Sequence, residues 1–103
     1  MNSKELLDRY ATGERNFEDA ELTGANLSGS KLVMVDLSGA SLKSSNFSNA
    51  SLSNARLIGA DLNSANLQQS KMLGANLSGA QLNRADLSGS NLLGANLSGA
   101  NLV

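Results

Sequence analysis

Serine and aspartate are the residue types in this chain that could carry catalytic chemistry. Serine is abundant, but a serine nucleophile needs a neighbouring base, and the chain has no histidine and no cysteine. The absence of both residues also removes the usual ligands of zinc, haem and iron–sulfur sites. The aspartates Asp36, Asp61 and Asp86 fall on different sides of the repeat described below, so no carboxylate pair is evident. We therefore expect no enzyme activity, no cofactor and no metal site.

The size and charge of the chain narrow the function classes further. The 103 residues suffice for one domain, and eight basic against nine acidic residues give a net charge of −1. A nearly neutral chain lacks the electrostatic footprint of a nucleic-acid-binding protein. The N-terminus is charged from Lys4 onward and no apolar segment follows, so we expect no secretory signal and a cytoplasmic location. The longest apolar run, residues 32–35, is far too short to span a membrane.

The dominant feature of the sequence is a repeat with a period of five residues. Starting at Phe17, a large apolar residue returns at every fifth position, eighteen times in succession as far as Leu102. Two positions before it stands Ala in twelve units and Ser in four, with Arg15 and Val35 as the exceptions. The position directly before it is always polar, and the second position after it is Gly nine times.

A period of five fits neither an α-helix nor a flat strand. On a helix, five residues advance by about 500°, so the large residues would not share a face. In a strand they would alternate between the two faces. The pattern is satisfied when each unit contains a short extended piece and one bend, with Asn, Ser and Gly at the bends. All the large residues can then point to a common axis, and the sequence therefore predicts a solenoid with a narrow leucine core.

The repeated unit also resembles that of a known family. Ala-Asn-Leu-Ser-Gly at residues 75–79 and 95–99, and Ala-Asp-Leu-Asn-Ser at 60–64, are similar to the units of pentapeptide-repeat proteins. The resemblance covers residues 15–103. It implies an all-β solenoid, a right-handed quadrilateral β-helix with four pentapeptides per coil of twenty residues. Eighteen units then make about four and a half coils.

The sequence alone leaves the number of sides open. An eight-residue block recurs after twenty residues, at 73–80 and 93–100, which favours four sides. Serines at the small position do not decide the question. Ser30, Ser70 and Ser90 align at a spacing of twenty, whereas Ser30, Ser45 and Ser90 align at fifteen.

The first fourteen residues lack the repeat, and we expect residues 1–14 to form a capping helix and a linker before the β-helix of residues 15–103. Asn2 or Ser3 can begin a helix over about 3–12, and Glu5 stands three residues after Asn2 as in a capping box. Gly13 is suited to end this helix, which has an apolar face: Leu6, Leu7, Tyr10 and Ala11. The predicted role is a cap over the first coil, and the alternative is a helix that docks a partner.

No comparable cap follows the last repeat. An uncapped coil leaves strand edges and apolar side chains exposed, which favours association. We therefore expect two chains to meet end to end as a homodimer through four C-terminal residues: Leu92, Leu97, Leu102 and Val103. The alternatives are a frayed end or a chain that continues further.

Two columns of outward-facing residues emerge when the coil is set at twenty residues. The first contains Val33, Ser53, Leu73 and Leu93, with Met34 beside it, and an apolar column of this kind can mark a partner surface. The alternative is an ordinary surface with scattered apolar residues. The second column is amide-rich, and we expect its side chains to bond between coils: Asn26, Asn46, Asn66 and Asp86.

The family resemblance implies two kinds of function. Some members mimic DNA and protect topoisomerases, and others act through protein–protein contacts. DNA mimicry needs a densely negative rod, because the phosphate spacing is copied electrostatically. From residue 22 onward this chain has three acidic and five basic residues, which disfavours a topoisomerase-binding mimic. We therefore expect a non-enzymatic interaction scaffold whose partner is another protein of unknown identity, with no nucleic-acid and no membrane partner.

Overall fold

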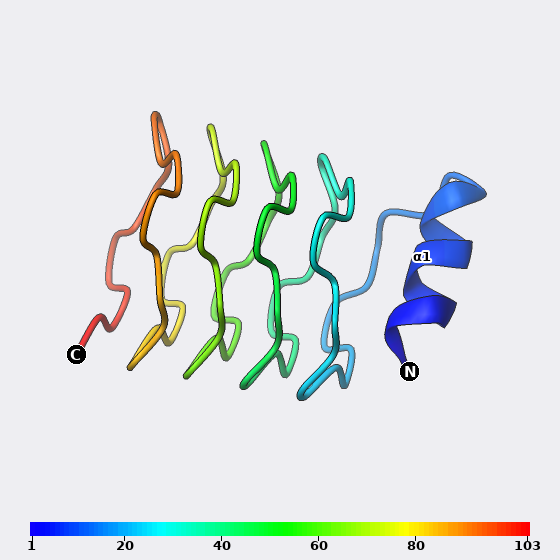
Figure 1. The fold of residues 1–103 in the computed structure, drawn as a ribbon, viewed down its shortest axis with the longest axis horizontal. Coiled ribbons are helices and arrows are strands. Elements are labelled where there is room, and N and C mark those ends of the chain that lie inside the picture. Colours follow the sequence, from blue (N-terminus) through cyan, green and yellow to red (C-terminus); the bar gives the residue numbers. More distant parts are fainter.

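The computed structural model describes all 103 residues as a short rod of stacked coils with one helix at its N-terminal end (Figure 1). The rod measures 34 × 23 × 20 Å. Helix α1 spans Ser3–Ala11 and is the sole helix. No continuous strand forms, because each extended piece is so short that it contributes a single β-bridge.

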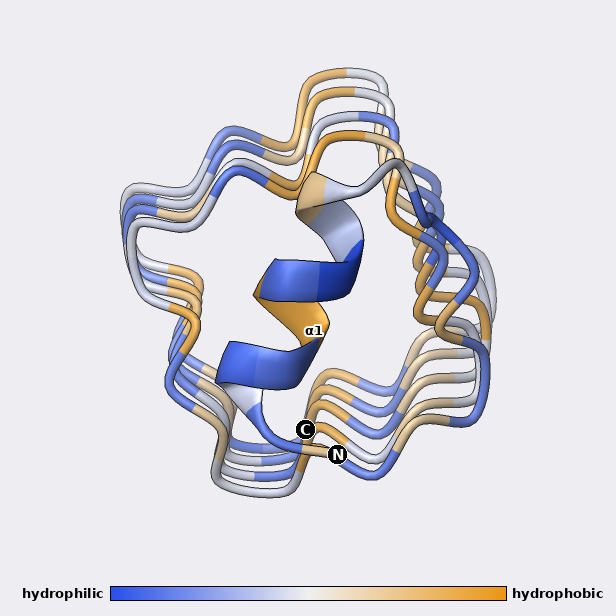
Figure 2. Cartoon of the chain, turned by 90° about the vertical axis from the view of Figure 1, so that its right-hand side faces the viewer, coloured by the Kyte–Doolittle hydropathy of each residue, from blue (hydrophilic) through white to orange (hydrophobic).

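The bridges define four parallel ladders along the rod. All fourteen join residues that are twenty apart, and the ladders begin at Asn16, Glu21, Asn26 and Lys31. We call them the first to fourth ladders in that order. Each coil therefore has four sides, and the view along the axis shows the coils lying over one another around a common centre (Figure 2). The register of twenty resolves the ambiguity between fifteen and twenty that the serine spacing leaves.

Each repeat ends in a β-turn that bends the chain toward the next side. In seventeen turns, the N–H of the small residue donates to the carbonyl of the central apolar residue three positions earlier, as Ala75 N does to Met72 O at 3.1 Å. The second residue after the central one has φ between 57° and 74° in all seventeen, and the first has a positive φ in none. This is the pattern of a type II turn. It explains the nine glycines at that position, because glycine adopts positive φ without strain.

The polar residue before each central position stabilises the same turn through a hydrogen bond from its side chain to the backbone. Asn76 is typical: its Oδ1 accepts a hydrogen bond from the backbone N of Ser78 at 3.0 Å, which forms an Asx-turn. Ten of the eleven Asn and Asp residues at this position bond in this way. The N–H concerned is not used by the bonds between coils, so the side chain supplies its partner.

This geometry corrects the interpretation of the amide-rich column. The Oδ1 atoms of Asn26, Asn46, Asn66 and Asp86 accept from the backbone within their own turn, and do not bond from coil to coil as expected. The reason is distance along the chain, since the N–H two residues ahead lies within reach in every turn. The bond between coils in this column comes from another residue, Gln68, whose Nε2 donates to Asp86 Oδ2.

The central residues fill the axis of the rod, as the repeat predicts. All fourteen from Phe17 to Leu82 are at most 3% exposed. The small residues beside them are also buried through the middle coils, from Val35 to Ala80. A larger side chain at the small position would point into this packed layer, so Arg15 stands outside it, exposed beside helix α1.

The start of α1 follows from its N-cap. The side chain of Asn2 accepts from the backbone N of Glu5 at 2.8 Å, which satisfies one of the free N–H groups of the first turn. The Glu5 carboxylate does not return the bond of a capping box, because it accepts instead from Arg9 Nη1 at 3.3 Å. Glu5 in the first turn and Arg9 in the last both suit the helix dipole.

The end of α1 is set by Gly13. Thr12 is the C-cap, and Gly13 follows it with φ of 104°, a conformation that favours glycine. The N–H of Gly13 donates to Tyr10 O at 2.9 Å, and the N–H of Glu14 donates to Arg9 O at 3.2 Å. These two bonds form a Schellman motif, which ends the helix one residue earlier than the range expected from the sequence.

Candidate interaction surfaces

Helix α1 lies across the N-terminal opening of the rod and buries Leu6, whereas Leu7 and Ala11, which the sequence analysis placed on the same apolar face, stay exposed. Figure 2 shows the helix lying across the four-sided opening. Leu6 is fully buried against the core, and the Tyr10 hydroxyl donates to the carbonyl of Val33 in the first coil at 2.6 Å. The guanidinium of Arg15 lies 3.7 Å from the centre of the Tyr10 ring. The helix is therefore attached by the buried Leu6 side chain and by contacts that Tyr10 makes with Val33 and Arg15.

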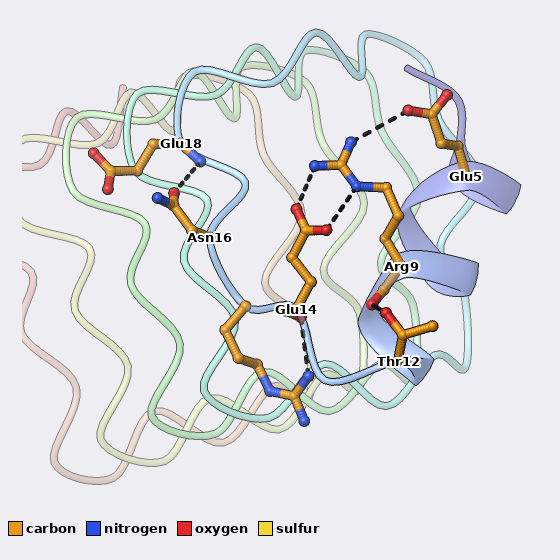
Figure 3. Close-up of polar contacts among 7 residues, drawn as sticks. Glu5, Arg9, Thr12, Glu14, Asn16 and Glu18 are labelled. Carbon is orange, nitrogen blue, oxygen red and sulfur yellow. Dashed lines mark hydrogen bonds and ion pairs between the residues drawn. The ribbon is translucent and has the colours of Figure 1, made fainter.

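Arg9 ties the helix to the segment that leads into the first coil. Its guanidinium donates to both carboxylate oxygens of Glu14 and to Glu5, as Figure 3 shows. The same group lies 5.1 Å from the centre of the Phe17 ring. The hydrogen bonds that Arg9 donates to Glu14 lower the pKa of Glu14 and raise the pKa of Arg9. The Arg9–Glu14 pair thus connects helix α1 to the segment that follows it.

The structure brings together the apolar column expected from the sequence. Val33, Ser53, Leu73 and Leu93 follow one another along the fourth ladder, because Asn54 N donates to Leu73 O and Gly74 N donates to Leu93 O in adjacent coils. Val33 is 37% exposed and Leu93 is 73% exposed, whereas Leu73 is half-buried. The column is thus apolar at both ends and interrupted by one serine.

Met34 extends this column at its N-terminal end. It is 63% exposed and occupies a turn position with φ of 63°, where glycine is the residue without strain. The left-handed conformation costs a non-glycine residue about 1 kcal/mol. Packing inside the rod does not account for a large apolar side chain in this conformation, because most of Met34 faces solvent.

The C-terminal end of the rod has no covering element. Leu92 and Leu97 are half-buried, and Leu102 and Val103 are 54% and 90% exposed. In earlier coils the central N–H donates to the next coil, as Leu82 N does to Asn101 O at 2.7 Å. The matching N–H groups of the last coil have no backbone acceptor: Leu87, Leu92, Leu97 and Leu102. This end therefore combines free strand edges with apolar side chains.

Charge is distributed unevenly along the rod. Six of the nine acidic residues lie within the first 21 residues. The three aspartates of the repeat lie on the first, second and third ladders: Asp36, Asp61 and Asp86. The structure therefore keeps them apart, on different sides of the coil, which is the arrangement expected from the sequence. Asp36 forms an ion pair with Arg56 at 3.5 Å. The Ser88 hydroxyl and backbone N–H bond Asp86 and lower its pKa.

A groove that the sequence analysis missed lies on the second corner, formed by the turns that follow the second ladder. It has a volume of about 450 Å³, and Val103 is its one apolar lining residue among seven: Lys43, Asn63, Ser64, Asn83, Arg84, Asn101 and Val103. The signal in the sequence is the turn position itself. On this corner three successive coils replace glycine with Ser44, Ser64 and Arg84.

The repeat, the ladders and the turns can now be compared with known proteins. A model of pentapeptide repeats matches eight copies over residues 20–59, 36–72 and 72–102. The chain belongs to the pentapeptide-repeat family. No curated protein sequence matches it. The family fold is the right-handed quadrilateral β-helix, which agrees with four ladders of twenty-residue register.

Two solved structures illustrate the relationship. The pentapeptide-repeat protein alr5209 from Nostoc PCC 7120 is 38% identical with a TM-score of 0.62, and the match covers 93% of this chain and 75% of that one. HetL, a pentapeptide-repeat protein involved in heterocyst differentiation regulation in Nostoc sp. strain PCC 7120, is 33% identical with a TM-score of 0.57. That match covers 94% of this chain but spans about half of HetL, 49%.

Helix α1 does not have the length and hydropathy of a membrane span.

Proposed function

We propose that this pentapeptide-repeat protein is a non-enzymatic scaffold that binds another protein through the apolar residues of this column, Val33, Leu73 and Leu93, together with Met34 beside them. The observation that carries the proposal is the exposure of two large apolar side chains on one corner, Met34 at 63% and Leu93 at 73%. Exposed apolar groups that share one face are typical of contact sites. We place this scaffold in the cytoplasm.

The energetic contribution of the apolar column can be estimated from burial. Fully covering a Leu or Met side chain contributes about 1.5–3 kcal/mol. Covering Met34 and Leu93, which are mostly exposed, would therefore supply about 2–4 kcal/mol after allowing for their existing burial. The repeat backbone holds both residues in fixed register, so little further ordering is needed on binding.

The test compares paired leucine substitutions with a matched control. A pull-down from native lysate uses the wild-type chain, the double variant Leu73→Ser/Leu93→Ser, and Ile58→Ser as the control. Ile58 occupies the same place in its repeat but lies on another corner. A partner retained by wild type and Ile58→Ser but lost by the double variant supports the proposal. Equal recovery by all three chains contradicts it.

The proposal includes an architectural role for α1 as the cap of about four and a half coils. Its support is the fully buried Leu6 and the bond from Tyr10 to the first coil. Substituting Leu6→Ala removes a buried side chain and should cost about 2–5 kcal/mol of stability. Thermal unfolding followed by circular dichroism measures this loss. An unchanged melting temperature together with lost partner binding would favour the docking-helix alternative.

We also propose a weak homodimer formed end to end through Leu92, Leu97, Leu102 and Val103. Its support is the uncovered C-terminal edge with exposed Leu102 and Val103. The end face of the rod is at most 23 by 20 Å. A dimer would therefore bury about 800 Å² in total, well below the roughly 1,600 Å² of a standard interface. Association should accordingly be reversible and dependent on concentration.

Sedimentation velocity over a range of concentrations tests the homodimer. The wild-type chain should shift toward twice its mass as concentration rises, and Leu102→Asp should stay monomeric because it places a charge in the contact. Asn2→Asp adds the same charge at the opposite end and should behave as wild type. A wild-type chain that remains monomeric at the highest concentration would exclude this contact.

DNA mimicry is the weaker alternative for this chain. The rod from residue 22 onward carries a net charge of +2, from five basic and three acidic residues. A positive rod does not reproduce the charge of duplex DNA. A gyrase supercoiling assay separates the two functions: we expect no effect of the purified chain on supercoiling, and protection or inhibition would favour the mimic.

A further inference from the structure

The groove on the second corner contains two basic side chains that lack partners. Of the five basic residues after residue 22, Arg56 is the one in an ion pair. Lys43 and Arg84 form no side-chain hydrogen bond or ion pair, and both line the groove. No aspartate or glutamate side chain lines the groove. The groove thus holds two cationic side chains with no acidic side chain beside them.

The groups between these cations are amides and a hydroxyl. Asn63 is held in place because its Oδ1 accepts from Asn83 N at 2.9 Å and its Nδ2 donates to Gln81 Oε1 at 3.1 Å. Ser64 follows it in the wall of the groove. Fixed polar groups beside unpaired cations resemble the lining of a site for a charged, hydrogen-bonding ligand.

The spacing of the cations limits the ligand. Lys43 lies two coils before the coil that carries Arg84, which corresponds to about 10 Å along the rod. Two long side chains at this spacing can each hold one anionic group of an extended ligand. The cavity of about 450 Å³ is large enough for a small di- or tricarboxylate or a short acidic peptide segment.

The turn position of Arg84 points to the same corner. Its φ is 63°, and Ser64 and Ser44, one and two coils earlier, share this conformation. Every other corner has at least two glycines among its turns at this position, whereas the second corner keeps only Gly24. A non-glycine residue is strained in this conformation, and strain of this kind recurs at binding sites.

We propose that the second-corner groove is an oxyanion site in which Lys43 and Arg84 bind the carboxylate or phosphate groups of a ligand. Charge-assisted bonds from ammonium and guanidinium groups to such oxyanions are stronger than neutral ones. The site lies on the opposite corner from the apolar column, so it does not depend on the proposed protein partner.

The test is an NMR titration of the full ¹⁵N-labelled chain at low ionic strength, because salt would screen these charges. Citrate serves as the small-molecule probe, and a synthetic peptide with two aspartates serves as the peptide probe. We expect saturable shifts at the amides of Asn63, Asn83 and Arg84 with at least one probe. The probe that saturates at lower concentration identifies the source of the oxyanion.

A pair of charge-matched variants decides whether binding is specific. Lys43→Gln/Arg84→Gln should weaken binding by at least about tenfold, because each charge-assisted bond contributes more than a neutral one. Lys31→Gln/Lys71→Gln removes the same charge from unpaired lysines of the fourth ladder and should change the affinity by less than about twofold. Equal losses in both variants, or no saturable shift at the groove with either probe, would overturn the proposal.

Discussion

The Asx-turns lead to a quantitative prediction about stability. Asn76 lies in a central coil, and its Oδ1 supplies the one hydrogen-bond partner of the Ser78 N–H. We expect Asn76→Ala to lower the free energy of unfolding because this N–H loses its acceptor. Ser51 occupies the equivalent place on the fourth ladder but makes no such bond. It provides both a control and a reverse test.

The expected magnitude follows from the bond and the burial. A net backbone hydrogen bond contributes about 0.5–1.5 kcal/mol, and leaving a buried donor unpaired costs about 1–3 kcal/mol. Ser78 is half-buried, so water can partly replace the acceptor. We therefore expect Asn76→Ala to cost about 1 kcal/mol. For a domain of this size that corresponds to a melting temperature lower by about 4–8 °C.

Urea denaturation followed by circular dichroism measures the effect. Ser51→Ala should leave the midpoint almost unchanged, because no bond is lost. Ser51→Asn should raise the free energy of unfolding by about 1 kcal/mol, because the new amide oxygen can accept from the unpaired Ser53 N–H. The reasoning fails if both alanine variants lose the same stability, or if Ser51→Asn brings no gain.

Three further predictions concern single groups. Hydrogen bonds from Arg9 lower the pKa of Glu14, so the pair should stabilise the fold above the ordinary glutamate pKa and this stability should disappear as the pH falls through the lowered value; the pH dependence of the melting temperature should flatten in Arg9→Gln. Ser70 has a buried hydroxyl without a partner, so Ser70→Ala should stabilise the chain by about 1 kcal/mol in urea titrations, and a loss would contradict this. Gly39→Ala should destabilise more than Gly59→Ala, because its new Cβ meets the aspartate side chain of the preceding coil while Gly59 faces open space; differential scanning calorimetry compares them, and equal losses would show that backbone strain alone decides.

The axis of the fold could be predicted from the sequence because one residue type repeats without interruption. Large residues at every fifth position leave no helix or flat strand that buries them all, so a solenoid follows. The number of sides could not be derived in this way. Ser45 departs from the twenty-residue spacing of the other serines at the small position, and it fits a fifteen-residue coil instead. The number of sides becomes known only from the register of the β-ladders, which is twenty residues.

The surfaces were harder to predict than the core. The apolar column of Val33 and Leu93 could be read from residue type alone once a twenty-residue coil was assumed. The bonds of Asn46 could not, because an amide can bond within its own turn or to the next coil with similar geometry. The groove could not be predicted from composition, because its prediction requires knowing that the turns with Lys43 and Arg84 lie on the same corner.

The constant register between coils constrains how such a chain can change in length. Every bridge joins positions twenty apart, so each corner of the rod is a column fixed by counting. Removing a single pentapeptide between Leu73 and Leu93 would preserve the leucine core yet rotate everything beyond it by a quarter turn, moving Leu93 to a neighbouring corner. Only insertions or deletions of whole twenty-residue coils would keep the existing columns aligned. In this fold, growth by twenty residues lengthens a surface, whereas growth by five replaces it with another.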